Sequence, residues 1–164
     1  MLALIFNAPF TKQDSMKLER TQVGVAGEYF VAAELSLRGY IASITLRNTR
    51  GIDIIASTKD GEKSVNIQVK TNNTDSKKWV LTQKSESFHS DNHFYVFVSM
   101  EGLSKNPEYY IVPSKEVSKQ ITQSHATWLA GKKADGSPRM DSNVRKFCLP
   151  EDSKYKDNWS SLFK

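Results

Sequence analysis

The sequence has only one cysteine, Cys148, among its 164 residues. A single cysteine cannot form an intramolecular disulfide, and it cannot supply a zinc site of the multi-cysteine kind. A long hydrophobic run is also missing, because the apolar opening MLALIFNAPF soon gives way to the polar segment TKQDSMKLER. That opening lacks the basic start of a signal peptide, so we interpret it as a terminal strand or docking arm. We expect a cytoplasmic protein with no membrane partner.

Several catalytic motifs are missing as well. The chain contains no G-x-S-x-G, no phosphate-cradling glycine loop and no dinucleotide fingerprint. Hydrolases with a nucleophile triad and nucleotide-dependent enzymes are therefore excluded. His89 and His93 are four residues apart, but the sequence offers no evident third ligand, so we do not expect a zinc site.

The composition is that of an ordinary globular domain, with 38% hydrophobic and 25% charged residues. The net charge of +5 favours an anionic partner, although a modest excess is also common on proteins that bind none. From the length we predict a single domain over residues 1–164. Its core is expected at about 16–130, with residues 131–164 forming a loop and a C-terminal docking segment.

Hydrophobic periodicity predicts one helix followed by several strands. Strands are expected at 41–47, 51–57, 64–71, 93–100 and 108–113, with 76–82 as an extension of the sheet. Helices are expected at 15–38, at 82–91 (short and polar) and at 114–130, the last capped by Ser114. The pattern indicates a domain that mixes helices with one sheet.

A hairpin is the strongest local signal in the chain. Asp60 and Gly61 suit the two central positions of a type I′ turn, which need positive φ. The register of that turn places Asp53 opposite Gln68, and Lys70 projects from the same face two residues further on. Apolar residues occupy the other face, namely Ile52, Ile54, Val65, Ile67 and Val69. One small patch thus gathers an acid, an amide and an ammonium group.

This patch has the chemistry of metal-assisted phosphodiester hydrolysis. The two oxygens can hold a hard cation while Lys70 faces an anion beside it. Glu28 is a fourth candidate, because it shares a helix face with small and apolar residues rather than with a basic partner. The alternative for Glu28 is a place at the helix edge, where its carboxylate reaches water.

Three motifs resemble the PD-(D/E)XK nuclease superfamily, in the branch where the motif is Gln-x-Lys, as in some homing endonucleases and Mrr-like restriction enzymes. They are G-V-A-G-E-Y-F-V-A-A-E-L, R-G-I-D-I-I-A and I-Q-V-K-T, within residues 20–100. The resemblance implies a restriction-endonuclease-like αβββαβ core in an α/β (α+β) mixed sheet, with a further C-terminal strand and helices. It also implies cleavage of DNA with Mg²⁺, or with Mn²⁺ in its place.

The resemblance assigns roles residue by residue. Glu28 matches the helix glutamate, Asp53 the metal-binding aspartate, Gln68 the position that is more often acidic, and Lys70 the catalytic lysine. Gln68 removes one negative charge from the metal site, and Gly51 with Ile52 replaces the proline-containing lead-in. The metal ligands implied are therefore Asp53, Gln68 and Glu28.

Basic residues are candidates for phosphate contact, with Arg50, Lys77, Lys78 and Lys84 preferred over the pairs Lys132–Lys133 and Arg145–Lys146. Cleavage of both strands usually calls for two active sites, which favours a homo-oligomer. Two other functions stay open. One is a non-catalytic DNA- or protein-binding module of the same fold, in which the polar patch is structural. The other is a regulator whose basic surface meets an acidic partner.

Overall fold

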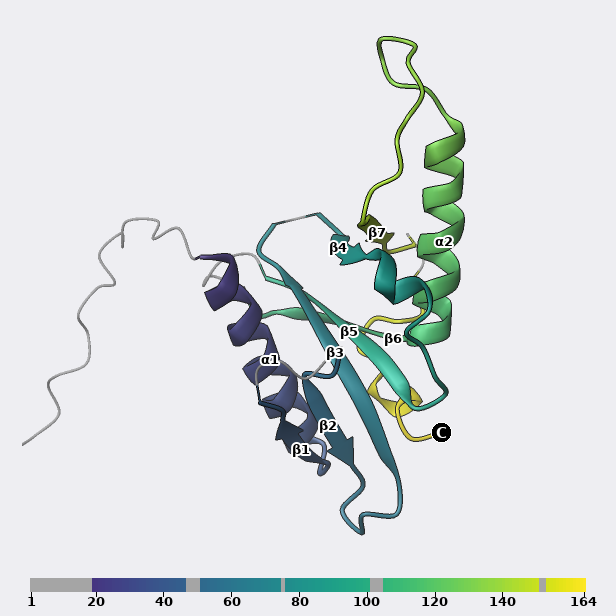
Figure 1. Cartoon of the computed structure of the whole chain (residues 1–164). Coiled ribbons are helices and arrows are strands. Elements are labelled where there is room, and N and C mark those ends of the chain that lie inside the picture. Colours follow the sequence, from purple (N-terminus) through teal and green to yellow (C-terminus); the bar gives the residue numbers. More distant parts are fainter. Residues whose placement is uncertain (1–18, 47–50, 75, 101–104, 151–152) are drawn as a thin grey trace, which may run out of the picture.

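The computed structural model of the chain describes residues 19–46, 51–74, 76–100, 105–150 and 153–164. Its centre is a five-stranded sheet with strand order β1-β2-β3-β5-β6 (Figure 1). The strands are β1 (Ile41–Ile44), β2 (Ile54–Ser57), β3 (Ser64–Asn72), β5 (His93–Ser99) and β6 (Glu108–Pro113). Neighbours are antiparallel except β3 and β5, which are parallel, so the sheet is mixed.

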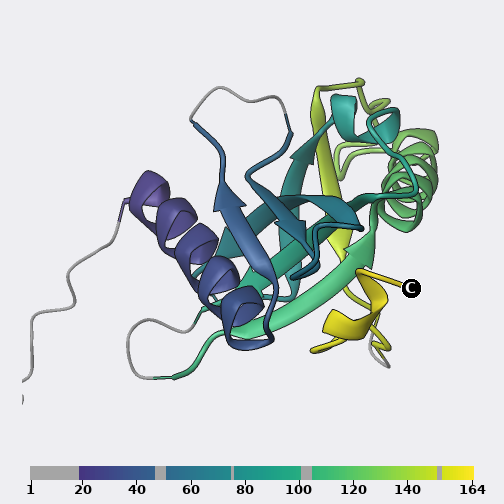
Figure 2. The same ribbon diagram turned by 90° about the horizontal axis from the view of Figure 1, so that it is seen from below.

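Helices and a second, smaller sheet cover the two faces of the central sheet. Helix α1 (Arg20–Leu37) lies across one face, and helix α2 (Ser114–Ala130) lies on the other side (Figure 2). The smaller sheet pairs β4 (Lys78–Thr82) with β7 (Val144–Cys148) and packs beside α2. Two short 3₁₀ turns complete the fold, η1 (Gln83–Glu86) and η2 (Trp159–Ser161).

Strand β3 explains why the molecule has two cores. Val65, Ile67 and Val69 are buried and face α1, as the alternation of the sequence predicts. The opposite face of the sheet presents Tyr95 and Phe97 of β5 to a second core, which contains Trp79, Phe147, Val117 and Ile121. Phe97 stacks on Phe147 with ring centroids 4.3 Å apart. The intervening residues of β3 are polar and half-buried.

Helix α1 packs on β3 through a close backbone approach at Gly27. A Cβ atom at this position would lie 1.8 Å from Oγ1 of Thr71. Val23, Gly27, Val31 and Leu35 form the buried stripe of the helix, one turn apart. A glycine is therefore required where the helix crosses the strand.

The predicted mixed α/β class is confirmed, since α1 precedes three strands of a mixed sheet and a second helix follows the last strand of that sheet. Four local predictions are wrong. Residues 78–82 pair with β7 instead of extending the main sheet, and β7 itself lies in a segment predicted as loop. The short helix expected at 82–91 is a single 3₁₀ turn. Ser114 does not cap α2: Pro113 is the cap residue, and the Ser114 hydroxyl bonds to Ser90.

The C-terminal segment packs against the α1 side of the sheet. Trp159 and Leu162 are buried there, and the ring centroids of Phe163 and Tyr40 are 4.5 Å apart. Arg38, at the end of α1, lies over the Trp159 ring at 4.8 Å. Residues 1–10, interpreted above as a strand or docking arm, fall outside the described residues. Among the described helices, none is both long and apolar enough to cross a membrane.

Candidate active site

The β2–β3 hairpin has the register that the sequence predicts. Ile54 pairs with Ile67 and Ser57 with Ser64, and a hydrogen bond from Thr58 N to Lys63 O (3.0 Å) continues the same pairing. The predicted type I′ turn is wrong, because Asp60 does not have positive φ. The connection has four residues, 59–62, closed by a bond from Gly61 N to Thr58 O. Compared with the predicted two-residue turn, the loop contains one more residue from each side. Its length therefore stays even, and the register of the two strands is unchanged.

Asp53 stands where the hairpin ladder ends. Its backbone N–H donates to Ile67 O (2.8 Å), and its carbonyl accepts from Thr45 N (2.9 Å), which ties it to β3 on one side and to the end of β1 on the other. Its carboxylate Oδ2 accepts a bond from Val69 N at 2.7 Å. The carboxylate thus lies against the peptide group that joins Gln68 to Val69. The structure brings Asp53 beside Gln68, but through the β3 backbone and not as a regular cross-strand pair.

The Asp53 carboxylate is partly removed from water, and its polar neighbours only partly offset the cost of burying its charge. Burial raises the pKa of Asp53, and the Val69 amide and the nearby Lys70 ammonium lower it only in part. The other carboxylate oxygen, Oδ1, forms no hydrogen bond with any residue that the structure describes. An additional cation at Oδ1 would favour the ionised acid and offset its desolvation.

Gln68 and Lys70 flank the point that Asp53 contacts. Both are half-buried on the face of β3 opposite the α1 core. Neither side chain forms a hydrogen bond or ion pair with another residue in the described part of the chain. The Gln68 amide oxygen and the Lys70 ammonium therefore remain available to a ligand.

This donor set fits a hard divalent cation. Mg²⁺ binds through one or two protein oxygens and fills its other positions with water or substrate phosphate. Asp53 and Gln68 supply a carboxylate oxygen and an amide oxygen of that kind. Within the described ranges, no group of three or more His, Cys, Asp or Glu residues could hold a metal by itself. The chain would thus provide an open site and not a closed structural one.

Glu28 is half-buried on α1, one residue after the contact between Gly27 and Thr71. Thr71 follows Lys70 directly in β3. The close approach of helix and strand places Glu28 on the α1 side of β3, whereas Gln68 and Lys70 lie on the opposite face of the strand. The role of Glu28 as a ligand stays a prediction.

Tyr95 is a residue of this site that the sequence did not reveal. It is fully buried, and in the parallel pairing of β3 with β5 it lies beside Gln68. Its hydroxyl has no hydrogen-bond partner among the described residues. Burial raises the pKa of Tyr95, and the nearby Asp53 carboxylate also raises it. The neighbouring Ser85 side chain lowers this pKa, although it does not form a hydrogen bond with the Tyr95 hydroxyl. The β3–β5 register would have identified Tyr95, but periodicity alone does not define that register.

The four predicted phosphate-binding residues differ in their surroundings. Arg50 lies outside the described residues. Lys77 forms an ion pair with Glu108 and donates to Ser99 Oγ (3.0 Å), so a phosphate would have to compete with these partners. Lys78 and Lys84 are exposed and form no ion pair within the described part of the chain. These two remain the better candidates.

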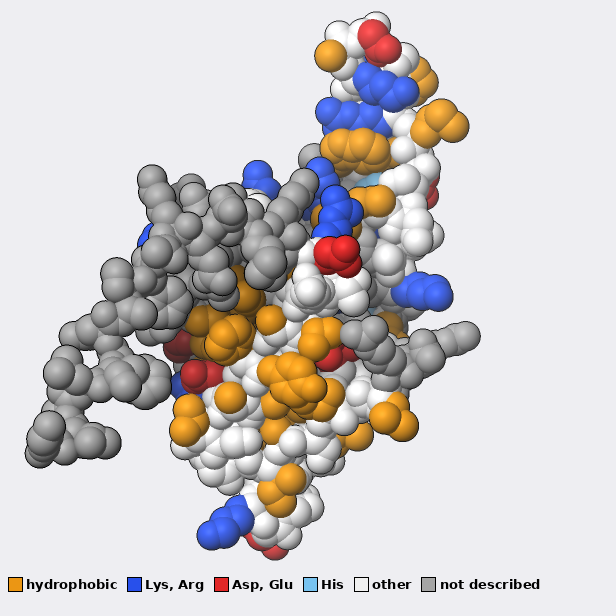
Figure 3. All heavy atoms as spheres, turned by 90° about the vertical axis from the view of Figure 1, so that its left-hand side faces the viewer, with side chains coloured by type: hydrophobic (Ala, Val, Ile, Leu, Met, Phe, Trp, Pro, Cys, Tyr) orange, Lys and Arg blue, Asp and Glu red, His pale blue; other side chains and the backbone are white. Residues whose placement is uncertain are grey.

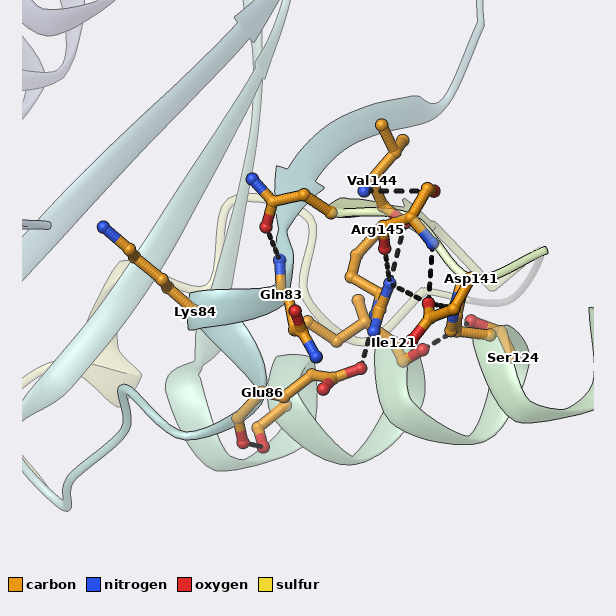
Figure 4. Close-up of polar contacts among 12 residues, drawn as sticks. Gln83, Lys84, Glu86, Ile121, Ser124, Asp141, Val144 and Arg145 are labelled. Carbon is orange, nitrogen blue, oxygen red and sulfur yellow. Dashed lines mark hydrogen bonds and ion pairs between the residues drawn. The ribbon is translucent and has the colours of Figure 1, made fainter. Parts of the chain in front are cut away.

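Arg145 holds η1 beside the site and is not available for a ligand. Its side chain is only 3% exposed and forms an ion pair with Glu86. It also donates to the Ser142 carbonyl at 2.6 Å, which joins η1 to the segment before β7 (Figure 4). Lys84 extends from η1 away from this network in the same view. The network fixes η1, from which Ser85 and Lys84 project.

Comparison with known proteins gives structural likeness only. Neither the protein-family models nor the curated proteins include a match to the chain. A Holliday junction resolvase from the archaeal hyperthermophile Archaeoglobus fulgidus is similar at TM-score 0.45 and 12% identity, covering 76% of this chain and 83% of the resolvase. A bacterial homing endonuclease is similar at TM-score 0.48 and 11% identity, covering 87% of this chain and 89% of that one. At 11% and 12% identity, this likeness concerns the fold alone.

Proposed function

We propose that the protein is a divalent-metal-dependent endonuclease that hydrolyses DNA phosphodiester bonds. The observation that carries this proposal is the Asp53 carboxylate, which is desolvated and accepts a bond from the N–H of Val69, the residue between Gln68 and Lys70 in β3. Perturbed acids beside a free basic group are typical of catalytic sites. The motifs that resemble PD-(D/E)XK nucleases fall on the same residues.

Each residue would have a separate task. Asp53 and the side-chain oxygen of Gln68 would hold Mg²⁺ or Mn²⁺, with Glu28 contributing through a water. When bound, such a cation lowers the pKa of a coordinated water and neutralises charge on a phosphate oxygen. Lys70 would donate to the phosphate, orient the nucleophile and stabilise the negative charge that grows in the transition state.

DNA is the substrate class that fits the surroundings of the site. The chain carries a net charge of +5, and Lys84 projects from η1 without an ion-pair partner among the described residues. Counterion release on contact with phosphates would favour binding. Cleavage of both DNA strands would require two copies of the chain. The protein would act in the cytoplasm.

A non-catalytic DNA- or protein-binding module is the second candidate, and one observation favours it. Gln68 occupies the position that is more often acidic, so the site has a single carboxylate on the hairpin. A binding module would keep the polar residues for structure and would not need a metal. A regulator with an acidic partner is a third possibility of the same non-catalytic kind.

The deciding experiment is incubation of the purified chain with supercoiled plasmid and Mg²⁺ or Mn²⁺. We expect nicked and linear product from wild type and a loss of about 10²- to 10³-fold for Lys70→Ala, because one charge-stabilising donor is removed. Lys59→Ala is the matched control, since it removes an exposed lysine at the hairpin tip. It should cleave like wild type.

Gln68→Glu separates the two candidates further. It adds a charge beside Asp53 and should tighten Mg²⁺ binding, measured by calorimetry without DNA. If wild type cleaves with neither metal, and Gln68→Glu gains neither affinity nor activity, the binding module is the correct interpretation.

A further inference from the structure

The second half of α2 and residues 131–143 form an arm that projects beyond the central sheet (Figure 1). The buried residues of α2 all lie in its first half, from Ser114 to Ile121. Trp128, near the end of the helix, is 42% exposed. The arm therefore contributes little to the core, and its shape needs another explanation.

The tip of the arm is a defined turn. Lys133 N donates to Ser137 O (2.9 Å), and Gly136 N donates to Lys133 O (3.0 Å). Gly136 adopts φ of 81°, which a side chain would disfavour. The carboxylate of Asp135 accepts from Ser137 N at 2.9 Å within the same turn. These bonds hold the flanking lysines in one place.

The base of the arm is fixed to α2 by aromatic and ionic contacts. Arg139 lies over the Trp128 ring at 5.1 Å and donates to the Trp128 carbonyl at 2.6 Å. His125 bonds to Asp141 at 2.8 Å, and Arg145 lies 3.5 Å from the same carboxylate. The arm is thus held in its projecting position before any partner binds, which lowers the entropic cost of binding.

The arm and the sheet at its base carry unpaired positive charge. Both acids of the arm are engaged, Asp135 in its own turn and Asp141 with His125 and Arg145. Five basic residues form no ion pair with the described residues, namely Lys132, Lys133, Arg139, Lys146 and Lys78. Lys and Arg side chains run from the arm towards the body on the face shown in Figure 3.

The pairing of β4 with β7 places the last two of these lysines together. Lys146 pairs with Val80 and Lys78 with Cys148, so the two lysines are diagonal neighbours. Both are exposed, whereas Trp79 and Phe147 fill the inner face. Diagonal neighbours lie about 7–8 Å apart, within reach of successive phosphates of one strand.

We propose that the arm, together with the outward face of the β4–β7 sheet, binds the phosphate backbone of duplex DNA outside the cleavage site. The proposal rests on the proposed function, for which this surface would supply affinity and leave the chemistry to the site at Asp53. Nucleic acid fits better than an apolar partner because five of the charges without an ion pair are positive and are spread along the surface, against a single negative one, Asp135, which is bonded only within its own turn.

The test compares two double variants that each remove two positive charges from opposite ends of the molecule (Figure 1). Lys132→Ala with Lys133→Ala changes the arm, and Lys59→Ala with Lys63→Ala changes the tip of the β2–β3 hairpin. Binding of a labelled DNA duplex is measured from 50 to 300 mM salt with Ca²⁺ as the cation, to prevent cleavage. We expect the arm variant to lower the slope of log affinity against log salt by about 1.8, because each phosphate contact contributes about 0.9. Its affinity near 100 mM salt should fall by about tenfold or more, while the control keeps the wild-type slope.

An arm variant that binds DNA with wild-type affinity and slope would overturn the proposal. The same holds if the variant changes only the oligomeric state in light scattering, since the surface would then be a contact between copies of the chain. Lys70→Ala serves as the reference for the proposed function, because it should lose cleavage while the arm contacts remain, so its salt slope should fall by no more than the value of one contact, about 0.9. A chain that binds DNA through the arm but cleaves none would refute the nuclease and leave the arm proposal intact.

Discussion

Asp53 directly precedes β2 and Glu108 begins β6 of the same sheet, and the surroundings of the two acids shift their pKa values in opposite directions. Glu108 accepts bonds from Lys156 at 2.6 Å, from Lys77, and from the Tyr110 hydroxyl at 3.1 Å. The bonds from Lys156 and Lys77 lower the pKa of Glu108 to about 2. Asp53 has one backbone N–H for its carboxylate, and burial raises its pKa.

The comparison distinguishes a structural acid from one prepared for a ligand. The cations that compensate Glu108 belong to the chain itself: Lys77 precedes β4, and Lys156 lies in the C-terminal segment. Their ion pairs with Glu108 link both segments to β6. Asp53 lacks full compensation, although folding has removed it from water. A desolvated charge is unfavourable for stability, and a binding site is the usual reason for keeping one. The two acids should therefore respond in opposite ways to neutralisation.

The largest expected effect is that of Asp53→Asn on cleavage. The amide has nearly the same shape and can still accept from Val69 N, but it removes the carboxylate of the site. We expect cleavage to fall by at least about 10³-fold, since the metal and its bound water would both be lost. Plasmid cleavage with Mg²⁺ measures the effect.

The same variant tests the stability side of the comparison. The folded-state pKa of Asp53 is raised, so stability falls as pH rises from the ordinary value of 3.8 through the folded-state pKa, and the loss is then complete and constant. Without metal, Asp53→Asn should be as stable as wild type at pH 7, or more stable by up to about 1 kcal/mol. A clear loss of stability in urea would show that Asp53 is a structural acid like Glu108.

Glu108→Gln should show the reverse behaviour, with a moderate effect. Because the folded-state pKa is lowered, the stability from Glu108 is present above pH 4.5 and is lost as pH falls towards 2. We expect a loss of about 1 kcal/mol at pH 7, kept small because the side chain is 36% exposed and solvent screens the pairs. Urea unfolding at pH 7, 4.5 and 2.5 checks this.

The difference between Glu108→Gln and wild type should shrink across that pH range, and plasmid cleavage should not change at pH 7. A difference that is constant with pH would mean that the variant disturbs packing instead of the ion pairs.

The smallest expected effect is that of Tyr95→Phe. The hydroxyl of Tyr95 is buried without a hydrogen-bond partner among the described residues, which is unfavourable. Removing it should raise the free energy of unfolding by up to about 1 kcal/mol, measured by urea titration at pH 7. A loss above 1 kcal/mol would instead reveal a bound water or ligand at this hydroxyl.

Much of the hairpin site could be predicted because side chains alternate along a strand. The register of Asp53 with β3 survived a wrong turn type, since adding one residue to each side of a loop does not move the strands. The bond from the Asp53 carboxylate to Val69 N was not predictable, because it depends on the ladder ending at Ile54. The alternation of residues along a strand predicts which face of the sheet each side chain occupies. The residue at which two strands stop pairing depends on the neighbouring strands.

The strand β7 and the role of Lys77 escaped prediction for a related reason. Arg145 occupies an inward position of β7, so the segment lacks the alternation of a strand with one apolar face. Its charge is accommodated by Glu86, which lies 59 residues away in sequence. Lys77 likewise finds Glu108 only through the fold. Charged residues look solvent-exposed in a sequence until their distant partners are known.

The contact between Gly27 and Thr71 limits how the protein can vary. Rotating the Thr71 side chain would not make enough room, because its Cβ does not move on rotation and would lie 3.0 Å from the new carbon. Any larger residue would shift the helix that carries Glu28. In a saturation screen scored by survival, Gly27 would therefore be as intolerant as an active-site position, although it contributes no atom to the chemistry.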